Sequence, residues 1–395
     1  MVSPYLPWPL HGGGVIRIYH LLKALKRQGH ETLLLAGSAD PGMNVDRALS
    51  SLCCAVRLFP APPIGGLAAY LQSLCSLSPY PASKFASSDF KKTWNRLLNS
   101  QKFDIVWMNF SIMGEVLFTD APQGAIVFLE EHESQELVWH DFAKEGSLAQ
   151  RAFAYVNLLK LRRFEDRVLG RVKAVFSVSD LEADLMRRRV PSGVEVLTVP
   201  NGADLEYYQP IPFARREPNT VLLSGNMSVK RNIDAVLWFV EGVFPLVRKA
   251  ISEVRLLIVG ANPAVKVRAL GSRQGVQVTG TVSDTREYHA KSRITVAPYR
   301  FGAGTKLKVV EAMACGTPLV STSIGCRGLD VTNEKHLLIA DSETDFAKCV
   351  VRLLRDPETA ATMADEARRL VETKYNWRSI FGQLETGLTQ LTKLG

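Results

Sequence analysis

The sequence has no long hydrophobic run. No apolar stretch approaches the roughly 18–20 residues that a membrane-spanning helix requires, so we expect any contact with a bilayer to be peripheral. No signal peptide is recognisable either. Cysteine is scarce: there are six, none in a Cys-x-x-Cys pair and none at a metal-binding spacing. We therefore expect buried thiols in a reducing cytosol.

Several catalytic signatures are also missing. The glycine loop at 11–14 is of the type found in lipase-like hydrolases, but that chemistry needs a Gly-x-Ser-x-Gly motif, which does not occur. A His-Glu-x-x-His zinc helix fails because position 136 is Glu136. A nicotinamide-dependent dehydrogenase would need Gly-x-Gly-x-x-Gly after the first strand, and no Asp-x-Asp metal motif is seen. Basic residues are spread out without an aromatic platform, which argues against nucleic acid as a partner.

The composition is that of a globular protein with an excess of positive charge. The 395 residues are 46% hydrophobic and 22% charged, which fits two or three soluble domains. The net charge of +9 suits an acidic ligand, an anionic membrane surface or nucleic acid without choosing between them. Predicted strands, such as 220–224, 254–260 and 276–280, alternate with helices, which predicts an α/β protein with parallel sheets.

One stretch, residues 294–322, has the layout of a binding site. A buried-looking strand at 294–298 precedes a glycine-rich turn at 302–305, a helix at 306–313 and a second strand at 318–322. In open α/β sheets this order places a ligand at the carboxyl ends of the strands.

The residues of this turn favour an anionic ligand. Gly302 and Gly304 let backbone N–H groups approach a phosphate, and the helix start adds partial positive charge. Lys306 and Lys308 lie where the macrodipole disfavours cations, so a bound anion would explain them; the alternative is two solvated lysines on an ordinary helix. Glu311 could accept hydrogen bonds from the hydroxyls of a sugar, although a lone helix glutamate is usually a surface residue.

A second candidate site follows the predicted strand 125–129. His132 stands there among the carboxylates of residues 130–133, and strand ends are where α/β enzymes place their chemistry. The alternative is a solvated histidine in an acidic loop. Asn109, at the end of the predicted strand 103–109, is a further candidate for substrate contact.

The segment 302–322 resembles the donor-site motif of the retaining GT-B glycosyltransferases of family four, also called glycosyl transferases group 1. It contains Gly-x-Gly-x-Lys-Leu-Lys-Val-Val-Glu-Ala-Met-Ala-Cys-Gly-Thr-Pro-Leu-Val-Ser-Thr. The usual pattern of the family is Glu, seven residues, Glu. The second acid matches Glu311, and Ala303 stands in place of the first, as in a subset with a Gly-Ala-Gly-Thr turn. The likeness covers nearly the whole chain and is strongest from 220 to 329.

The resemblance implies the GT-B fold, in which two Rossmann-like domains with parallel sheets face a central cleft. It implies an N-terminal acceptor-binding domain at 1–204, a linker at 205–219 and a C-terminal nucleotide-sugar-binding domain at 220–375. A final helix at 376–395 would pack back onto the first domain. A few further residues would precede Met1, which makes the first strand short.

The activity implied is transfer of a sugar, with retention, from a UDP- or GDP-linked donor to a glycan, lipid-linked or small-molecule acceptor, in polysaccharide or glycoconjugate biosynthesis. No metal or other cofactor would be required. His132, near the sugar, and Glu311, on the ribose, would be the catalytic residues. Arg231 matches a phosphate-binding lysine of the family. It would form a two-charge clamp on the diphosphate with Lys306, Lys308 or Lys230. The residues expected to bind substrates are Gly13, Gly14, Asn109, Lys230, Arg231, Gly302, Ala303, Gly304, Thr305, Lys306 and Lys308.

Alternatives stay open at this level. A nucleotide-sugar epimerase would share the fold, and Ala303 leaves room for a non-catalytic nucleotide-sugar-binding protein. The hydrophobic segment 67–77 predicts a helix with acceptor contacts. Residues 144–173 predict basic helices with apolar faces, either packed with a solvated basic side or lying on an anionic membrane. We expect a cytoplasmic protein, with a peripheral contact at the inner face of the membrane under the second interpretation.

Overall fold

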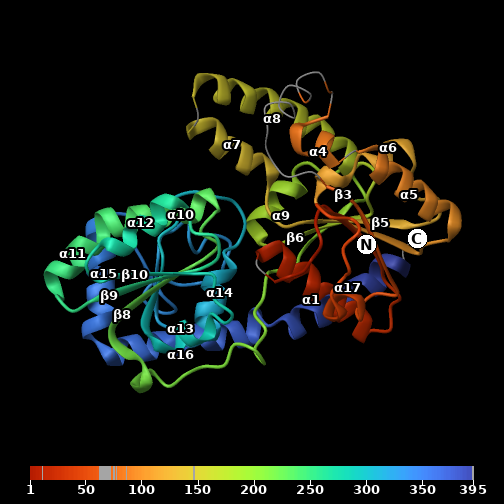
Figure 1. The fold of residues 1–395 in the computed structure, drawn as a ribbon. Coiled ribbons are helices and arrows are strands. Elements are labelled where there is room, and N and C mark those ends of the chain that lie inside the picture. The colour runs from red at the N-terminus through yellow and green to blue at the C-terminus, as the bar shows by residue number, and fades with distance from the viewer. Residues whose placement is uncertain are drawn as a thin grey trace. The chain divides into compact units, whose positions relative to one another are not determined.

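The computed structural model describes residues 1–10, 12–61, 73, 76, 78–85, 87–145 and 147–393. These include every residue that we expect to bind substrates or to act in catalysis. His11 of the glycine loop and nearly all of the predicted helix at 67–77 lie outside the described residues. The chain divides into two compact units, Met1–Pro200 with Phe381–Gly395, and Asn201–Ile380 (Figure 1).

The first unit contains a seven-stranded sheet in the order β3-β2-β1-β4-β5-β6-β7, and every neighbouring pair is parallel. Its strands are β1 (Val2–Ser3), β2 (Leu33–Ser38), β3 (Ala55–Pro60), β4 (Ile105–Asn109), β5 (Ile126–Glu131), β6 (Ala174–Ser177) and β7 (Glu195–Thr198). Its helices are α1 (Gly13–Arg27), α2 (Arg47–Ser50), α4 (Tyr80–Phe85), α5 (Ser88–Ser100), the turn η1 (Ser111–Met113), α6 (Val116–Thr119), α7 (Gln135–Glu145), α8 (Leu148–Leu169), α9 (Asp180–Arg187) and the part of α17 (Trp377–Lys393) from Phe381 onward.

The second unit contains a six-stranded parallel sheet in the order β10-β9-β8-β11-β12-β13. Its strands are β8 (Glu217–Ser224), β9 (Arg255–Val259), β10 (Val276–Gly280), β11 (Ser292–Ala297), β12 (Leu319–Ser321) and β13 (Leu338–Ile339). Its helices and helical turns are η2 (Phe213–Arg215), α10 (Lys230–Trp238), η3 (Phe239–Val243), α11 (Phe244–Ala250), α12 (Val265–Ala269), η4 (Leu270–Ser272), α13 (Arg286–Lys291), α14 (Leu307–Ala314), α15 (Glu343–Arg355) and α16 (Pro357–Lys374). The predicted α/β class with parallel sheets is confirmed in both units.

Alternate residues of each strand face opposite layers of helices. In β2, Leu34 and Ala36 pack with Ile18 and Leu22 of α1, whereas Leu35 belongs to the core on the other face. In β8, Val221 and Leu223 likewise join one core, and Leu222 joins another. Because successive side chains of a strand point to opposite faces, a sheet covered on both sides needs apolar residues at consecutive positions.

Two local predictions can be compared with the structure. The helix that begins at Asp180 is capped by Ser179, whose side chain accepts from the backbone N–H of Glu182, as a Ser cap predicts. Strand β8 begins at Glu217, three residues before the predicted start at Thr220, because Glu217 pairs with Ser292 of β11.

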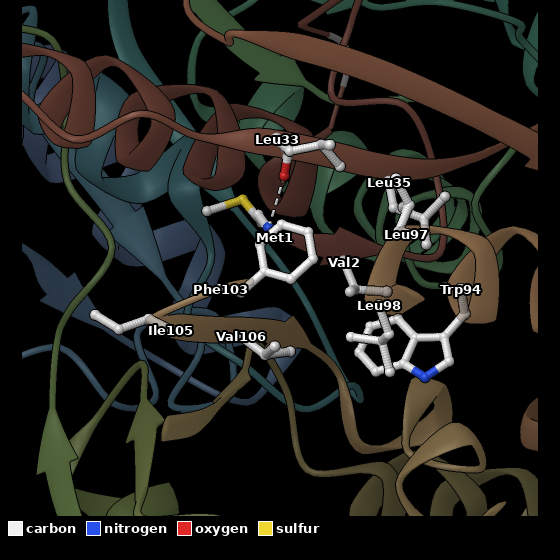
Figure 2. A pocket seen from close by; sticks show the side chains of 10 residues that line it. All are labelled: Met1, Val2, Leu33, Leu35, Trp94, Leu97, Leu98, Phe103, Ile105 and Val106. Carbon is white, nitrogen blue, oxygen red and sulfur yellow. Dashed lines mark hydrogen bonds between the residues drawn. The ribbon is translucent and has the colours of Figure 1, made fainter. Parts of the chain in front are cut away.

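The first strand, β1, is the shortest strand of its sheet, and the sequence analysis predicted a short strand here. Val2 lies between Leu35 of β2 and Met108 of β4, and the α-amino group of Met1 donates to the Leu33 carbonyl at 2.8 Å. Beside this strand lies a small apolar pocket, shown in Figure 2. It is lined by Met1, Val2, Leu33, Leu35, Trp94, Leu97, Leu98, Phe103, Ile105 and Val106.

Within the described part of the chain, no helix combines the length and the apolar character needed to cross a bilayer. The five cysteines that the structure describes, Cys53, Cys54, Cys315, Cys326 and Cys349, are free thiols.

Candidate functional site

The glycine-rich turn of the second unit joins β11 to the start of α14, as predicted. Gly302 and Gly304 have φ angles of 110° and 72°, a region that favours glycine over residues with a side chain. Ala303 between them is buried, and α14 runs from Leu307 to Ala314. The first turn of a helix leaves its N–H groups without intrahelical acceptors, so this turn presents donors at the carboxyl end of β11.

Lys306 stabilises this turn through hydrogen bonds to its backbone carbonyls. Its ammonium group is buried and donates to the carbonyl oxygens of Gly302 (3.0 Å), Ala303 (2.8 Å) and Gly304 (2.7 Å). The cation therefore offsets the partial negative charge of three carbonyls that point inward. The sequence offered a bound anion or solvation as the reason for Lys306. The solvated alternative is wrong for this buried lysine, and the structure shows a structural role that the sequence analysis did not predict.

Arg231 lies against the same turn. A Cβ placed on Gly302 would lie 3.1 Å from Cδ and 3.9 Å from Nη1 of Arg231, and 3.8 Å from Nζ of Lys306. Arg231 and Lys306 therefore converge on Gly302, which is the pairing that the clamp hypothesis includes. Lys230, by contrast, is exposed, with its ammonium 5.9 Å from the centre of the Phe301 ring.

Glu311 is buried one turn into α14 with a defined set of neighbours. Lys308 donates to Glu311 Oε2 at 2.7 Å, which links these two predicted site residues to each other. Burial is the main cause of a raised pKa of Tyr208. The Glu311 carboxylate, which accepts a hydrogen bond from the Tyr208 phenol, raises that pKa further. Burial raises the pKa of Tyr299 to about 12, with Arg231 lowering it and Glu311 raising it, so the cation and the carboxylate both act on one ring.

Thr305 is held by a residue that the sequence did not assign to the site. Asn201 donates from Nδ2 to Thr305 Oγ1 at 2.7 Å. Asn201 belongs to the turn that follows Pro200, more than a hundred positions earlier in the chain. No local pattern could have paired the two residues.

In the first unit, the second candidate site is built on a buried ion pair. Arg17 Nε donates to Glu130 Oε1 at 2.7 Å, and both side chains are fully buried. Trp107 Nε1 donates to Glu130 Oε2 at 2.8 Å, and Arg17 Nη1 donates to the Pro200 carbonyl at 3.0 Å. Burial alone would raise the pKa of Glu130, but Arg17, His132 and Trp107 together hold it at about 2. Glu130 is therefore an anion at any ordinary pH.

His132 lies beside this pair and is buried, so the solvated alternative is wrong. Its Nε2 is 3.8 Å from Glu130 Oε2, and its ring lies 4.4 Å from the ring of Phe110. Among the residues that the structure describes, neither ring nitrogen has a hydrogen-bond partner. Burial lowers the pKa of His132 against the opposing effect of Glu130, so the imidazole is neutral near pH 7 and can donate or accept a hydrogen bond.

The glycine start of α1 lies next to His132. A Cβ on Gly14 would collide with the Tyr5 hydroxyl and lie 3.1 Å from His132 Nδ1, so any side chain at this position would force Tyr5 to move. Gly13 is the first residue of α1. The helix N-terminus and a buried, unbonded imidazole thus meet at Gly14, and Phe110 is held against them with a left-handed φ of 69°, a strain that often marks functional sites.

Asn109, a candidate for substrate contact, has a structural contact within the sheet. Its side-chain amide is fully buried at the end of β4 and donates to the Val2 carbonyl at 2.9 Å. Arg17, Glu130, Tyr5 and Phe110 were not predicted as site residues. Arg17 gave a signal, because it lies on the apolar face of α1 with Leu21, where a buried charge requires a partner.

Among the residues that the structure describes, no group of three or more His, Cys, Asp or Glu side chains could hold a metal ion.

Two parallel-sheet units define the fold, and a glycine turn with two cations before a helix is its candidate site. This combination defines a GT-B glycosyltransferase, and comparison with known proteins agrees. The model "Glycosyl transferases group 1" matches residues 218–356, and "Glycosyl transferase 4-like domain" matches 12–202. The chain belongs to the glycosyl transferases group 1 family and is a transferase of glycosyl groups.

Similar proteins span the same length. A phosphatidyl-myo-inositol mannosyltransferase of Mycolicibacterium smegmatis is 24% identical over 97% of this chain and 91% of its own. Sucrose-phosphate synthase from Thermosynechococcus elongatus superposes with a TM-score of 0.77 at 19% identity, covering 100% of this chain and 99% of its own. Anabaena HepE, solved with UDP and glucose, has a TM-score of 0.67 at 15% identity, with 98% of both chains covered. At these identities the two solved structures show the shared fold.

Proposed function

We propose that the protein transfers a sugar, with retention at the anomeric carbon, from a UDP- or GDP-linked donor to a glycan or lipid-linked acceptor. The observation that carries this proposal is the convergence of Arg231 and Lys306 on Gly302, at the start of α14. Two cations and a helix N-terminus at one glycine turn suit the negative charge of a diphosphate.

The leaving group explains why such a turn is useful for catalysis. When the sugar–phosphate bond breaks, negative charge grows on the nucleoside diphosphate. Fixed N–H groups and the Arg231 guanidinium stabilise that charge without reorganising, and Arg231 can pair bidentately with phosphate oxygens. Lys306 contributes positive charge and also fixes the shape of the turn through its three carbonyl contacts. On this proposal the protein requires no metal.

Glu311 and His132 take the roles of the catalytic residues. Glu311 accepts hydrogen bonds from the ribose hydroxyls of the donor, and Lys308 fixes the orientation of its carboxylate at 2.7 Å. His132 contacts the sugar as a neutral imidazole, and Gly13 and Gly14 place the backbone at the start of α1 beside the substrates. The unit Met1–Pro200 with Phe381–Gly395 binds the acceptor, and the unit Asn201–Ile380 binds the donor.

The choice of substrate class is supported by similar proteins. The mycobacterial relative is named for an acceptor that is a phosphatidylinositol, and Anabaena HepE was solved with UDP and glucose. These names favour a nucleotide-sugar donor and a lipid-linked or glycan acceptor. Our proposal places the reaction in polysaccharide or glycoconjugate biosynthesis in the cytoplasm.

A thermal-shift panel tests donor binding first. UDP, GDP, ADP and their sugars are added to the full-length protein, and a ligand that binds the folded state raises the melting temperature with its concentration. We expect a shift with the UDP or the GDP series. A panel in which no nucleotide moves the melting temperature would refute the proposal.

Two variants then locate the site. Glu311→Gln and Lys306→Met should both reduce the shift, whereas Lys348→Met, which removes a lysine that is 70% exposed on α15 of the same unit, should not. Incubating the matched nucleotide sugar with and without candidate acceptors separates transfer from epimerisation, and nuclear magnetic resonance of the product gives its anomeric configuration. An inverted product would contradict retention.

A further inference from the structure

Exposed apolar side chains gather on one helix of the first unit. Among the described residues, large hydrophobic side chains are exposed at nine positions, and four of these lie on α8. Leu148 is 83%, Tyr155 51% and Leu159 62% exposed. With the exposed Ala152 they follow the spacing i, i+4, i+7, i+11, which is one face of a helix. We call Leu148, Ala152, Tyr155 and Leu159 the α8 stripe.

The α8 stripe is a second apolar face of a helix that already has one. Ala154, Leu158 and Leu161 pack with Trp139 of α7 and Tyr80 of α4 on the opposite side. Burial in the unit therefore accounts for that inner face and leaves the outer one unexplained. Scattered exposed apolar residues are common, but a continuous row along about 16 Å of helix is not.

The charge next to the α8 stripe is positive. Arg151 and Arg163 flank it and are exposed, and neither forms an ion pair with a residue that the structure describes. Two acids near the stripe whose side chains the structure describes are paired: Glu136 with Arg162, and Asp166 with Arg189 at 2.8 Å. An apolar row with unneutralised arginines at its edges complements a surface with anionic groups over an apolar interior.

The position of the helix fits such a surface. Figure 1 shows the hairpin of α7 and α8 extending away from the strands of its unit. A protruding convex helix can enter the boundary between headgroups and acyl chains, where Leu and Tyr side chains are stabilised and arginines contact anionic headgroups.

We propose that the α8 stripe docks the protein onto the surface of an anionic lipid bilayer, with Arg151 and Arg163 at the level of the headgroups. The assignment does not rest on the proposed sugar transfer, since it uses no residue of either candidate site. The chain as a whole carries a net charge of +9, which adds long-range attraction to the same surface.

The test is sedimentation of the full-length protein with two kinds of vesicle. One contains phosphatidylcholine alone, and the other contains equal parts of phosphatidylcholine and phosphatidylglycerol. We expect binding to the anionic vesicles that weakens with added salt. The triple variant Leu148→Ser, Tyr155→Ser, Leu159→Ser should lose at least about tenfold in partitioning, which corresponds to about 1.4 kcal/mol.

A matched triple variant controls for the general loss of apolar surface. Leu181→Ser, Leu246→Ser, Val265→Ser removes side chains that are 47%, 41% and 74% exposed elsewhere, and it should partition like the wild type. The melting temperature and the nucleotide-induced shift should be unchanged in both variants. Failure of the wild type to bind anionic vesicles, or wild-type partitioning of the α8 variant, would overturn the proposal. Light scattering that shows a dimer lost only in the α8 variant would assign the stripe to a second copy of the chain instead.

Discussion

Replacing Glu130 by glutamine should destabilise the first unit by about 3 kcal/mol. The carboxylate and the Arg17 guanidinium are 2.7 Å apart and fully buried, so removing one charge leaves the other without its counter-ion. Breaking such a buried pair typically costs about 3–5 kcal/mol. The pKa gives a similar figure, because a fall from 4.5 to about 2 on folding corresponds to about 3 kcal/mol at neutral pH.

The sign of the pH dependence follows from that lowered pKa. The contribution of Glu130 is fully present above its ordinary pKa of 4.5 and is lost as the pH falls towards 2. The glutamine variant should therefore be less stable than the wild type near neutral pH, and the difference should shrink in acid. Glutamine can still accept from Trp107, so the loss reports the charge more than the hydrogen bond.

Urea unfolding followed by tryptophan fluorescence measures the effect. Asp184→Asn is the matched control, since it breaks a pair with Arg187 at 2.6 Å that is 60% and 47% exposed, and it should cost less than about 1 kcal/mol. Adding Arg17→Met to Glu130→Gln should cost less than the sum of the two single changes. If the single loss equals that of the control, or if the double variant is strictly additive, our account of this pair is refuted.

Three further predictions concern single residues. Gly14→Ala should lower turnover by about tenfold or more, because the new methyl group would collide with Tyr5. Gly12→Ala is the control, since its methyl group would meet nothing within 4 Å and its turnover should be nearly that of the wild type. Equal turnover of the two variants would contradict this account. Lys306→Met should weaken the binding of nucleoside diphosphates by about tenfold, because three carbonyls of the turn lose their hydrogen-bond donor. Titration calorimetry measures the affinity, and an unchanged affinity would contradict this role of Lys306. Burial and the charge of neighbouring carboxylates raise the pKa of Glu131 to about 8, so its contribution to stability is present below 4.5 and is lost as the pH rises through 8; in urea unfolding Glu131→Gln should flatten that decline, and identical slopes would exclude Glu131 as its source.

Much of the second unit followed from local patterns. The turn at 302–305 has the two left-handed glycines and the strands on either side of α14 are parallel, as predicted. Helix α14 begins at Leu307, one residue after the predicted start. Apolar periodicity and glycine positions are properties of neighbouring residues, so they survive in the folded chain. The sequence predicted a positive charge at Lys306 for an anionic ligand, but it did not predict the hydrogen bonds of Lys306 to its own turn. Those carbonyls become acceptors only when the turn has formed.

The acidic run of β5 shows what a linear pattern cannot resolve. Glu130 and Glu131 are adjacent and chemically alike, but successive residues of a strand point to opposite faces of the sheet. Glu130 meets Arg17 of α1 and keeps its charge, with a pKa of about 2. Glu131 meets the backbone N–H of Ser111 and the carboxylates of Glu165 and Glu182, and its pKa rises to about 8.

By itself, the sequence determined the alternation of strands and helices, the parallel sheets, the glycine turn before α14 and the family. These depend on residue order and on spacings of a few positions. Only the tertiary structure decided which charges are buried with a partner, that His132 is enclosed and that α8 keeps an apolar face outward. The physical reason is that burial and electrostatic pairing depend on residues distant in sequence, such as Arg17 and Glu130, which meet only when the sheet is assembled.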